Sequence, residues 1–241
     1  MMTEKMIKRV LVTGADAGLG LSLVKRFLAG EFAVFAGVHR SDGQLRNLAS
    51  EYGDALALIP LDVANLDSVR AAAQRVSERT NTLDIVINNA GIHLVKNPSQ
   101  SLEQLDFENQ QFQQTMNVNA FGPLRVLQQF QPLLENSEHK LIINISSEAG
   151  SIADCRRENQ FAYCMSKAAL NMQSKILQNY LKPRGFKVLA VHPGWMRTNM
   201  GGPNATIAPD ESAEGIFQLA LKEWTADDPI YVDYLGVALP W

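Results

Sequence analysis

A tyrosine and a lysine stand four residues apart in the stretch AYCMSKAALN, which covers residues 162–171. On a helix this spacing places both side chains on one face, one turn apart, so the ammonium of Lys167 would lie close to the phenol of Tyr163. A phenol beside a cation loses its proton more readily than a free phenol, whose pKa is about 10. The pair therefore predicts a proton donor for a reaction in which an oxygen atom gains negative charge.

A second group of residues, in the stretch VTGADAGLG (12–20), has the composition of a phosphate-binding loop. Gly14 would allow a tight turn, Gly18 would let the backbone approach a pyrophosphate, and Gly20 would allow a helix to pack closely on a sheet. The spacing Gly-x-x-x-Gly-x-Gly differs from the commoner Gly-x-Gly-x-x-Gly. The free amides and dipole of the following helix predict a dinucleotide site, although a glycine turn needed only for packing would show the same residues.

The choice between NAD and NADP is made about 20 residues after such a loop, at the end of the second strand. An acid there accepts a hydrogen bond from the ribose of NAD, whereas an arginine receives the 2′-phosphate of NADP. The chain reads His39-Arg40-Ser41, with no carboxylate before Asp42. Arg40, helped by Ser41 and His39, therefore favours NADP over NAD. An Arg40 that simply faces solvent would leave the choice open.

The elements that must position these residues are short apolar runs and the segments between them. Runs rich in Val, Ile and Leu, typical of strands buried on both faces, cover residues 9–13, 33–38, 55–59, 83–88, 141–145 and 187–191. Segments with helical spacing of apolar residues alternate with them. This alternation predicts an α/β fold of Rossmann type, a doubly wound parallel sheet of about seven strands with helices on both faces, in three layers. Ligands would bind beyond the carboxyl ends of the strands.

The chain is expected to form one domain over residues 1–241, because no linker, repeat or low-complexity tract interrupts the alternation. The long stretch 194–210, rich in Gly, Pro and Asn, follows the sixth run. Its position at a strand end predicts a substrate lid, with a poorly ordered surface loop as the alternative.

Composition and net charge argue against two classes of binding partner. With 46% hydrophobic residues, a formal net charge of −3 and a pI near 5.8, the chain is expected to bind neither nucleic acid nor a membrane surface. Without a secretory or membrane-spanning segment, it is expected to be cytoplasmic. Cys155 and Cys164 are expected to be reduced thiols, and the four scattered histidines predict no metal site.

Five motifs in order along the chain resemble the short-chain dehydrogenase/reductase family. They are Thr13 to Gly20, Asn88-Asn-Ala-Gly91, Ser146-Ser147, Tyr163-x-x-x-Lys167 and Pro193-Gly194, and the resemblance extends from about residue 7 to the C-terminus. Within the family, SSEAGSI and VHPGWMRTNMGGPNA resemble the sniffer and C-factor group of carbonyl reductases. The resemblance implies an NADP-dependent enzyme that reduces the carbonyl group of a small aldehyde, ketone or quinone to an alcohol by hydride transfer.

The resemblance also implies roles for the catalytic residues. Tyr163 is expected to be the general acid, and Lys167 to lower its pKa and hold the nicotinamide ribose. Ser147 is expected to hydrogen-bond the substrate oxygen, because Ser147-x-x-Gly150 matches the family pattern, with Ser146 as the alternative. Asn119 is expected to position a water in a proton relay, with Asn117 as the alternative.

Cofactor contacts are implied at the strand ends. Asp62 and Val63 resemble the pair beside adenine, and Thr198 matches the residue that bonds the nicotinamide carboxamide. The remaining expected contacts, besides the glycines, Arg40, Ser41 and the catalytic pair, are Asp16, Leu19, Asn89, Ala90, Gly91, Pro193, Gly194 and Met196.

The chain departs from many family members in the spacing of sixteen positions from Ser147 to Tyr163, a stretch that includes the charged insert 154–158. This insert is expected to border the substrate. Arg156 and Arg157 could attract an acidic carbonyl compound or could simply be solvated. Pocket walls are expected from residues 93–98, 148–161 and 195–207, with Trp195 either lining the pocket or packing on the sheet edge.

Two further readings stay open. The same fold could serve a non-catalytic NADP-binding redox sensor that acts through a protein partner, although such a protein would be expected to lose Tyr163 or Lys167. An epimerase or dehydratase fits less well, because it usually needs an extra substrate domain. The resemblance also implies a homodimer or homotetramer built through the long helices around Asn119 and Tyr163.

Overall fold

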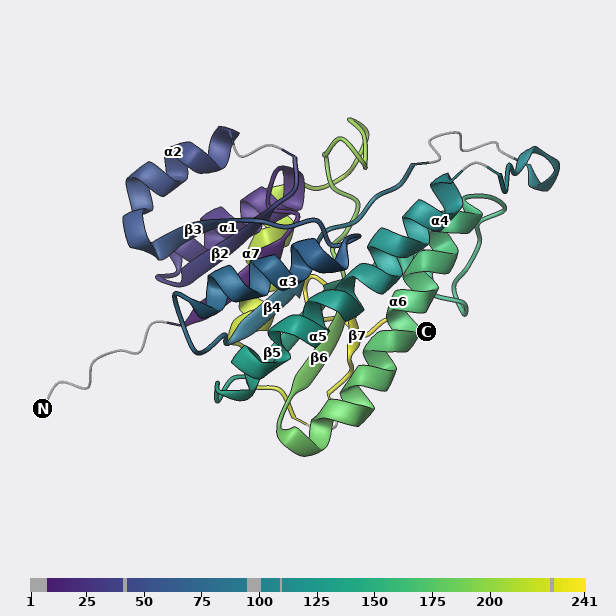
Figure 1. The fold of residues 1–241 in the computed structure, drawn as a ribbon. Coiled ribbons are helices and arrows are strands. Elements are labelled where there is room, and N and C mark those ends of the chain that lie inside the picture. Colours follow the sequence, from purple (N-terminus) through teal and green to yellow (C-terminus); the bar gives the residue numbers. More distant parts are fainter. Residues whose placement is uncertain (1–7, 41–42, 95–100, 109, 226–227) are drawn as a thin grey trace, which may run out of the picture.

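The computed structural model describes residues 8–40, 43–94, 101–108, 110–225 and 228–241. Its centre is a seven-stranded parallel sheet in the order β3-β2-β1-β4-β5-β6-β7 (Figure 1). The strands are β1 (Arg9–Thr13), β2 (Ala33–Val38), β3 (Leu56–Pro60), β4 (Ile85–Asn88), β5 (Leu141–Ile145), β6 (Lys187–His192) and β7 (Tyr231–Asp233). The predicted doubly wound α/β fold is thereby confirmed.

Strand positions follow the apolar runs closely. The runs at 9–13, 33–38 and 141–145 match β1, β2 and β5, the run at 55–59 is displaced by one residue, and β6 extends one residue past its run. The run at 83–88 begins two residues before β4, because the Leu83 backbone N–H bonds Leu133 O in the helix at Gly122–Glu135 and not a neighbouring strand. β7 is only three residues long, too short for a periodicity argument to locate.

Helices cover both faces of the sheet, which gives three layers (Figure 1). Within β1, Val10 and Val12 face a cluster that includes α1 (Gly18–Ala29) and α7 (Pro209–Leu221). Leu11 between them faces a cluster that includes α3 (Leu66–Ser77) and α5 (Gly122–Glu135). This alternation is why each strand had to be apolar on both sides. The helices are α1 (Gly18–Ala29), α2 (Gly43–Tyr52), α3 (Leu66–Ser77), α4 (Gln111–Met116), α5 (Gly122–Glu135), α6 (Phe161–Leu181) and α7 (Pro209–Leu221).

Strand order reverses between β1 and β4, because the chain winds outward to β3 and then crosses to the other half of the sheet. A doubly wound sheet binds its ligand in the crevice at such a point, beyond the carboxyl ends of the strands. The loops after β1, β4, β5 and β6 therefore surround the candidate site. None of the helices among the described residues is long and apolar enough to cross a membrane.

Candidate active site

The glycine loop after β1 is fixed by close backbone contacts. Gly14 and Gly18 have φ values of +63° and +55°, which favour glycine. A Cβ on Gly20 would lie 2.1 Å from Gly14 O and 2.7 Å from Asn89 Nδ2. The Asn89 amide in turn donates to Thr13 O at 2.8 Å and Gly14 O at 3.0 Å, so the end of β4 holds the loop in place.

Helix α1 presents its N-terminus to this crevice. Ala17 at the N-cap has no polar side chain, and no acidic residue stands in the first turn. The first amides of the helix are therefore not capped by Ala17, which suits the phosphates of a dinucleotide. Leu19 points its side chain into the core, so that only its backbone is available to a ligand.

At the end of β2, Asp16 acts on the protein itself. Its carboxylate accepts from the backbone N–H of His39 at 3.0 Å and from that of Arg40 at 2.8 Å, and so ties the glycine loop to this strand end. The side chain of Arg40 is exposed, as a phosphate ligand at the rim would be. Ser41, the other expected phosphate contact, lies outside the described residues.

Asp62 and Val63 follow β3. Asp62 Oδ1 accepts from the backbone N–H of Ala64 at 2.9 Å, and Asp62 Oδ2 lies 3.9 Å from His39 Nε2. The Val63 side chain is buried and would lie 2.9 Å from a Cβ on Gly122, so it points towards α5. Only the backbone of Val63 is left to face a cofactor.

The tyrosine and lysine of the opening motif both lie in α6, as the spacing predicts. Lys167 is buried, and its ammonium donates to Ile145 O at 2.8 Å and lies 5.8 Å from the centre of the Tyr163 ring. A Cβ on Gly91 would lie 3.7 Å from Lys167 Nζ. The lysine thus joins the ends of β4 and β5 to the tyrosine.

Asn119 is placed beside this lysine by a turn of π-helix, η3 (Asn117–Phe121), between α4 and α5. Its side chain accepts from Ile92 N at 2.8 Å and donates to Ile92 O at 2.9 Å and Ser166 Oγ at 3.0 Å. The alternative, Asn117, is turned away and bonds Arg125 at 2.6 Å. Inserted π-turns occur often at functional sites, and here the turn aims Asn119 at the site.

The two adjacent serines after β5 point in different directions. Ser146 is buried and donates to Asn171 Oδ1 at 2.6 Å, inside the packing of α6. Ser147 lies beside Tyr163 and acts to lower the pKa of its phenol. Its Oγ donates to Glu148 Oε2 at 2.5 Å and accepts from Ala149 N at 3.1 Å. The geometry therefore favours Ser147, the serine preferred from the sequence.

The proton-transfer groups have perturbed pKa values. Burial raises the pKa of Tyr163 to about 12, with the hydrogen bond from Ser147 acting in the opposite direction, so the phenol is protonated at neutral pH. Burial lowers the pKa of Lys167 to about 8. The pKa of Tyr163 is therefore raised and not lowered as expected, because burial of the phenol is the largest effect on it.

The segment after β6 closes over the glycine loop. Gly194 has a φ of +80°, and Met196 pairs with Ile207 in an isolated bridge. Thr198 lies near the loop, since a Cβ on Gly18 would meet its Cγ2 at 3.2 Å. Trp195 is 53% exposed and donates from Nε1 to Gly201 O, so it does not pack on the sheet edge. The last two residues of the predicted stretch 194–210 already belong to α7.

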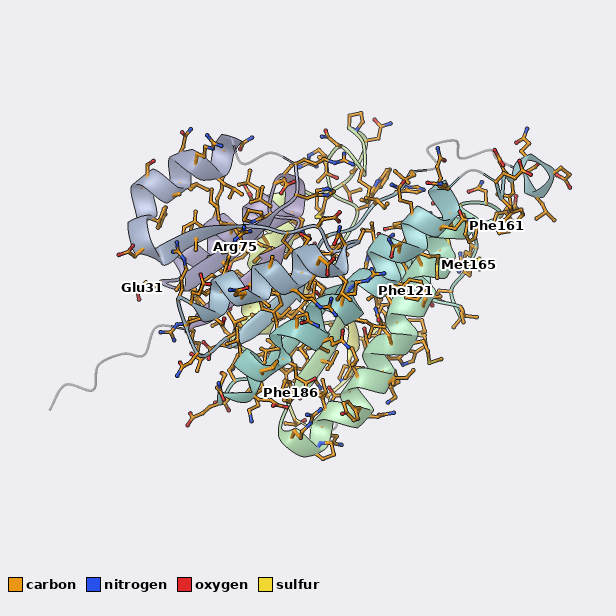
Figure 2. The ribbon with its side chains drawn as sticks, in the orientation of Figure 1. Glu31, Arg75, Phe121, Phe161, Met165 and Phe186 are labelled. Atoms are coloured by element: carbon orange, nitrogen blue, oxygen red, sulfur yellow. The ribbon has the colours of Figure 1, made fainter. Side chains whose placement is uncertain are left out.

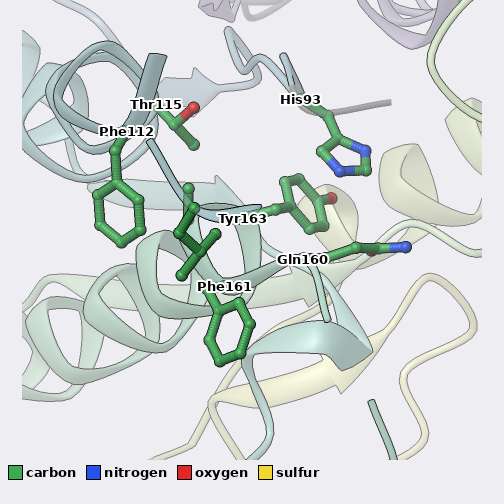
Figure 3. A pocket seen from close by; sticks show the side chains of 8 residues that line it. His93, Phe112, Thr115, Gln160, Phe161 and Tyr163 are labelled. Atoms are coloured by element: carbon green, nitrogen blue, oxygen red, sulfur yellow. The ribbon is translucent and has the colours of Figure 1, made fainter. Parts of the chain in front are cut away.

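A small pocket opens beside the tyrosine (Figure 3). The ring of His93 lies against that of Tyr163, with 4.6 Å between ring centres. The other walls of the pocket are mainly apolar. The residues that line it are His93, Leu105, Phe112, Thr115, Gln160, Phe161, Ala162 and Tyr163. Leu105, Phe112 and Thr115 were not expected from the sequence as wall residues. Phe112 and Thr115 could have been found from the spacing 112, 115, 119, which forms one helical stripe ending at the expected active-site asparagine. Expected wall residues 95–98 lie outside the described residues.

Known proteins are similar to this chain in sequence and in fold. The sequence model of the short chain dehydrogenase family matches residues 8–207. C-signal from Myxococcus xanthus is 35% identical over 173 residues, which cover 72% of this chain and all of that protein.

Two solved structures cover nearly the whole chain. The NADPH-bound carbonyl reductase from chicken fatty liver has 32% identity and a TM-score of 0.87, over 98% of this chain and 99% of that one. The carbonyl reductase Sniffer of D. melanogaster has 27% identity and a TM-score of 0.90, over 98% of this chain and 100% of that one. With the glycine loop, the tyrosine–lysine pair and the fold in agreement, the chain belongs to the short-chain dehydrogenase family of oxidoreductases.

Proposed function

We propose that this protein uses NADPH to reduce the carbonyl group of an aldehyde, ketone or quinone to an alcohol, with Tyr163 as the general acid. The observation that carries the proposal is the convergence of Tyr163, Ser147, Lys167 and Asn119 at the strand ends beside the glycine loop. NADPH-bound and carbonyl reductase relatives of the same fold support both the cofactor and the reaction.

The cofactor residues fit a dinucleotide. A Cβ on Gly20 would overlap the loop that cradles the phosphates, and the α1 N-terminus is not capped by the side chain of Ala17. The exposed Arg40 would bind the 2′-phosphate of NADP. Lys167 would hold the nicotinamide ribose and Thr198 the carboxamide. When bound, the reduced cofactor supplies the hydride.

The chain's own residues then manage the proton. As the substrate oxygen becomes negative, Tyr163 donates its hydroxyl proton to it, and Ser147 stabilises the charge by a hydrogen bond. The buried ammonium of Lys167 lies at the inner side of the tyrosine and would help to replace the lost proton, through a water held by Asn119. The apolar walls of the pocket exclude other water and favour substrates with an apolar group beside the carbonyl.

The proposed reaction is tested by following nicotinamide absorbance with NADPH, and separately NADH, against a panel of aldehydes, ketones and quinones. We expect Tyr163→Phe to lower kcat about a thousandfold, because it removes the proton donor. Its dissociation constant for NADPH should stay close to that of the wild type, since the ring remains. Full turnover in this variant would refute the role of Tyr163.

We also propose a homodimer or homotetramer formed through α6 and η3. Met165, Met172 and Ile176 are 52%, 62% and 57% exposed at helical spacing on α6, and η3, which contacts α6, exposes Phe121 (Figure 2). An apolar stripe of this kind is typical of an interface. Light scattering should show an oligomer that Met172→Glu dissociates, whereas Lys175→Glu on the same helix should leave the mass unchanged. A wild-type monomer would overturn this proposal.

We also propose that the protein is located in the cytoplasm. Cys155 and Cys164 are both free thiols, which suits a reducing compartment.

A further inference from the structure

A carboxylate directly follows the expected active-site serine, and it binds that serine's hydroxyl group. Ser147 Oγ donates to Glu148 Oε2 at 2.5 Å. The backbone N–H of Ala149 reaches Glu148 Oε2 at 2.9 Å and Ser147 Oγ at 3.1 Å. An ionised carboxylate only accepts hydrogen bonds, and a serine hydroxyl has a single proton. The proton of Ser147 is therefore directed to Glu148 and away from Tyr163.

The charged insert that distinguishes this chain holds Glu148 in place. Arg157 pairs with Glu148 Oε1 through Nη2, and its Nη1 donates to Gln160 Oε1 at 2.8 Å. Gln160 has a left-handed φ of +63° at the start of α6 and lines the pocket beside Tyr163. From β6, His192 Nδ1 accepts from the Glu148 backbone N–H at 3.2 Å. The long stretch between Ser147 and Tyr163 thus places an arginine against the carboxylate next to Ser147.

We propose that Glu148 is a positioning residue that accepts the hydrogen bond of the Ser147 hydroxyl, in competition with Tyr163, and so keeps Tyr163 protonated until a substrate oxygen arrives and receives that hydrogen bond instead. The role in catalysis rests on the proposed function. While its hydroxyl hydrogen points to Glu148, Ser147 Oγ has only lone pairs to offer the phenol. It can then accept from neutral Tyr163 but cannot donate to the ionised form, which is the hydrogen bond that would stabilise a phenolate.

The negative charge of Glu148 acts on the phenol in the same sense as burial and raises the pKa of Tyr163, as Cys164 does to a smaller extent. The hydrogen bond of Ser147 and the positive charge of Arg157 lower that pKa. The ring of His93 lies against that of Tyr163 at a tilt of 33°, and Lys167 lies 5.8 Å from the ring centre of the tyrosine. Burial would raise the pKa of Glu148, but Ser147, Arg157 and His192 together hold it below its usual value. Burial lowers the pKa of His192, so Arg157 is the main cation facing Glu148 at neutral pH.

The test measures the ionisation of Tyr163 directly, without substrate. Protein labelled with ¹³C at tyrosine Cζ is titrated by NMR with NADPH bound, and the Tyr163 resonance is identified by its loss in Tyr163→Phe. We expect Glu148→Gln to lower the pKa of Tyr163. Arg157→Ala should raise it, because a nearby positive charge is lost while Glu148 keeps its hydrogen bonds from Ser147 and Ala149 N. Glu148→Asp, which keeps the charge, should stay nearer to the wild type than Glu148→Gln.

Glu158→Gln is the matched control, because it removes a carboxylate from the exposed part of the same insert. It should leave the pKa of Tyr163 unchanged. Shifts of the same sign in Glu148→Gln and Arg157→Ala, or a Glu148→Gln shift no larger than that of Glu158→Gln, would overturn the proposal. Melting temperatures measured in parallel show that each variant is folded.

A second readout connects the inference to catalysis. For oxidation of an alcohol with NADP⁺, Tyr163 must first be ionised, so activity rises with pH through its pKa. The rising limb should move to lower pH in Glu148→Gln and to higher pH in Arg157→Ala, with the KM for the cofactor unchanged. If no substrate is ever turned over, the proposed function fails, but the NMR titration still decides whether Glu148 controls Tyr163.

Discussion

The half of the candidate site at β1 and β4 is built from backbone contacts, whereas the half at β5 and α6 is built from side-chain contacts. On the β1 and β4 side, glycines and backbone groups are in direct contact, and Asn89 bonds the carbonyls of Thr13 and Gly14. On the β5 and α6 side, side chains from separate segments meet, as Arg157 and Glu148 do. The backbone-built half depends on the spacing of a few residues along the chain, so a short motif specifies it. The side-chain-built half depends on how the charged insert 154–158 folds back onto Glu148, and a short motif does not specify that.

Substitution of Gly20 should have the largest effect on the backbone-built half. In Gly20→Ala the new Cβ would lie 2.1 Å from Gly14 O, and neither backbone can move without disturbing β1 or β4. We expect the free energy of unfolding to fall by about 3 kcal/mol and NADPH binding to be lost. Urea denaturation and fluorescence titration with NADPH measure the two effects.

The matched control is Gly53→Ala. Gly53 has a φ of +53° and nothing within 4 Å of an added Cβ, so only backbone strain of about 1 kcal/mol is expected. An equal loss in the two variants would show that packing at the glycine loop is not what makes Gly20 necessary.

Lys167, between the two halves, should show a conflict between stability and catalysis. Its pKa is lowered from 10.5 to about 8, so burial of the ammonium costs about 3 kcal/mol, by the conversion of pKa shifts into free energy. Lys167→Met removes this cost but also the hydrogen bond to Ile145 O, which contributes about 1 kcal/mol. At pH 7 we expect the variant without cofactor to be about 2 kcal/mol more stable than the wild type, and inactive.

The pH dependence of that difference identifies its cause. Below pH 8 the lysine is protonated in both the folded and unfolded states, so the wild type carries the full cost. Between pH 8 and 10.5 the folded state loses its proton first, and the stability of the wild type rises. The advantage of Lys167→Met should therefore shrink in urea denaturation at higher pH. A difference that stays constant from pH 7 to 10 would rule out burial of charge as the cause.

Arg40 should show the smallest effect, at the exposed edge of the backbone-built half. Arg40→Ala should raise the dissociation constant of NADPH about tenfold, the usual size of one charged hydrogen bond, and leave that of NADH nearly unchanged. Arg70→Ala, on α3 and paired with Asp67, is the control and should change neither constant. Equal weakening of both cofactors would mean that Arg40 does not read the 2′-phosphate.

The sequence predicts correctly those features that depend on the spacing of residues along one helix or strand. The alternation of apolar runs located six strands and the doubly wound fold, and the four-residue spacing of Tyr163 and Lys167 placed both in α6. Periodicity could not decide between Ser146 and Ser147, or between Asn117 and Asn119, because neighbours of one type differ only in where they point. The structure turns Ser146 towards Asn171 and Asn117 towards Arg125.

The sequence by itself determined the parallel sheet, the glycine loop and the family, because burial on two faces and close backbone contact each restrict residue types locally. Only the tertiary structure decided that Asp16 ties two strand ends together, that Phe112 lines the pocket, and that burial raises the pKa of Tyr163. It also decided what the charged insert does. Hydrogen bonds and desolvation depend on distances between segments far apart in the chain, and only folding sets those distances.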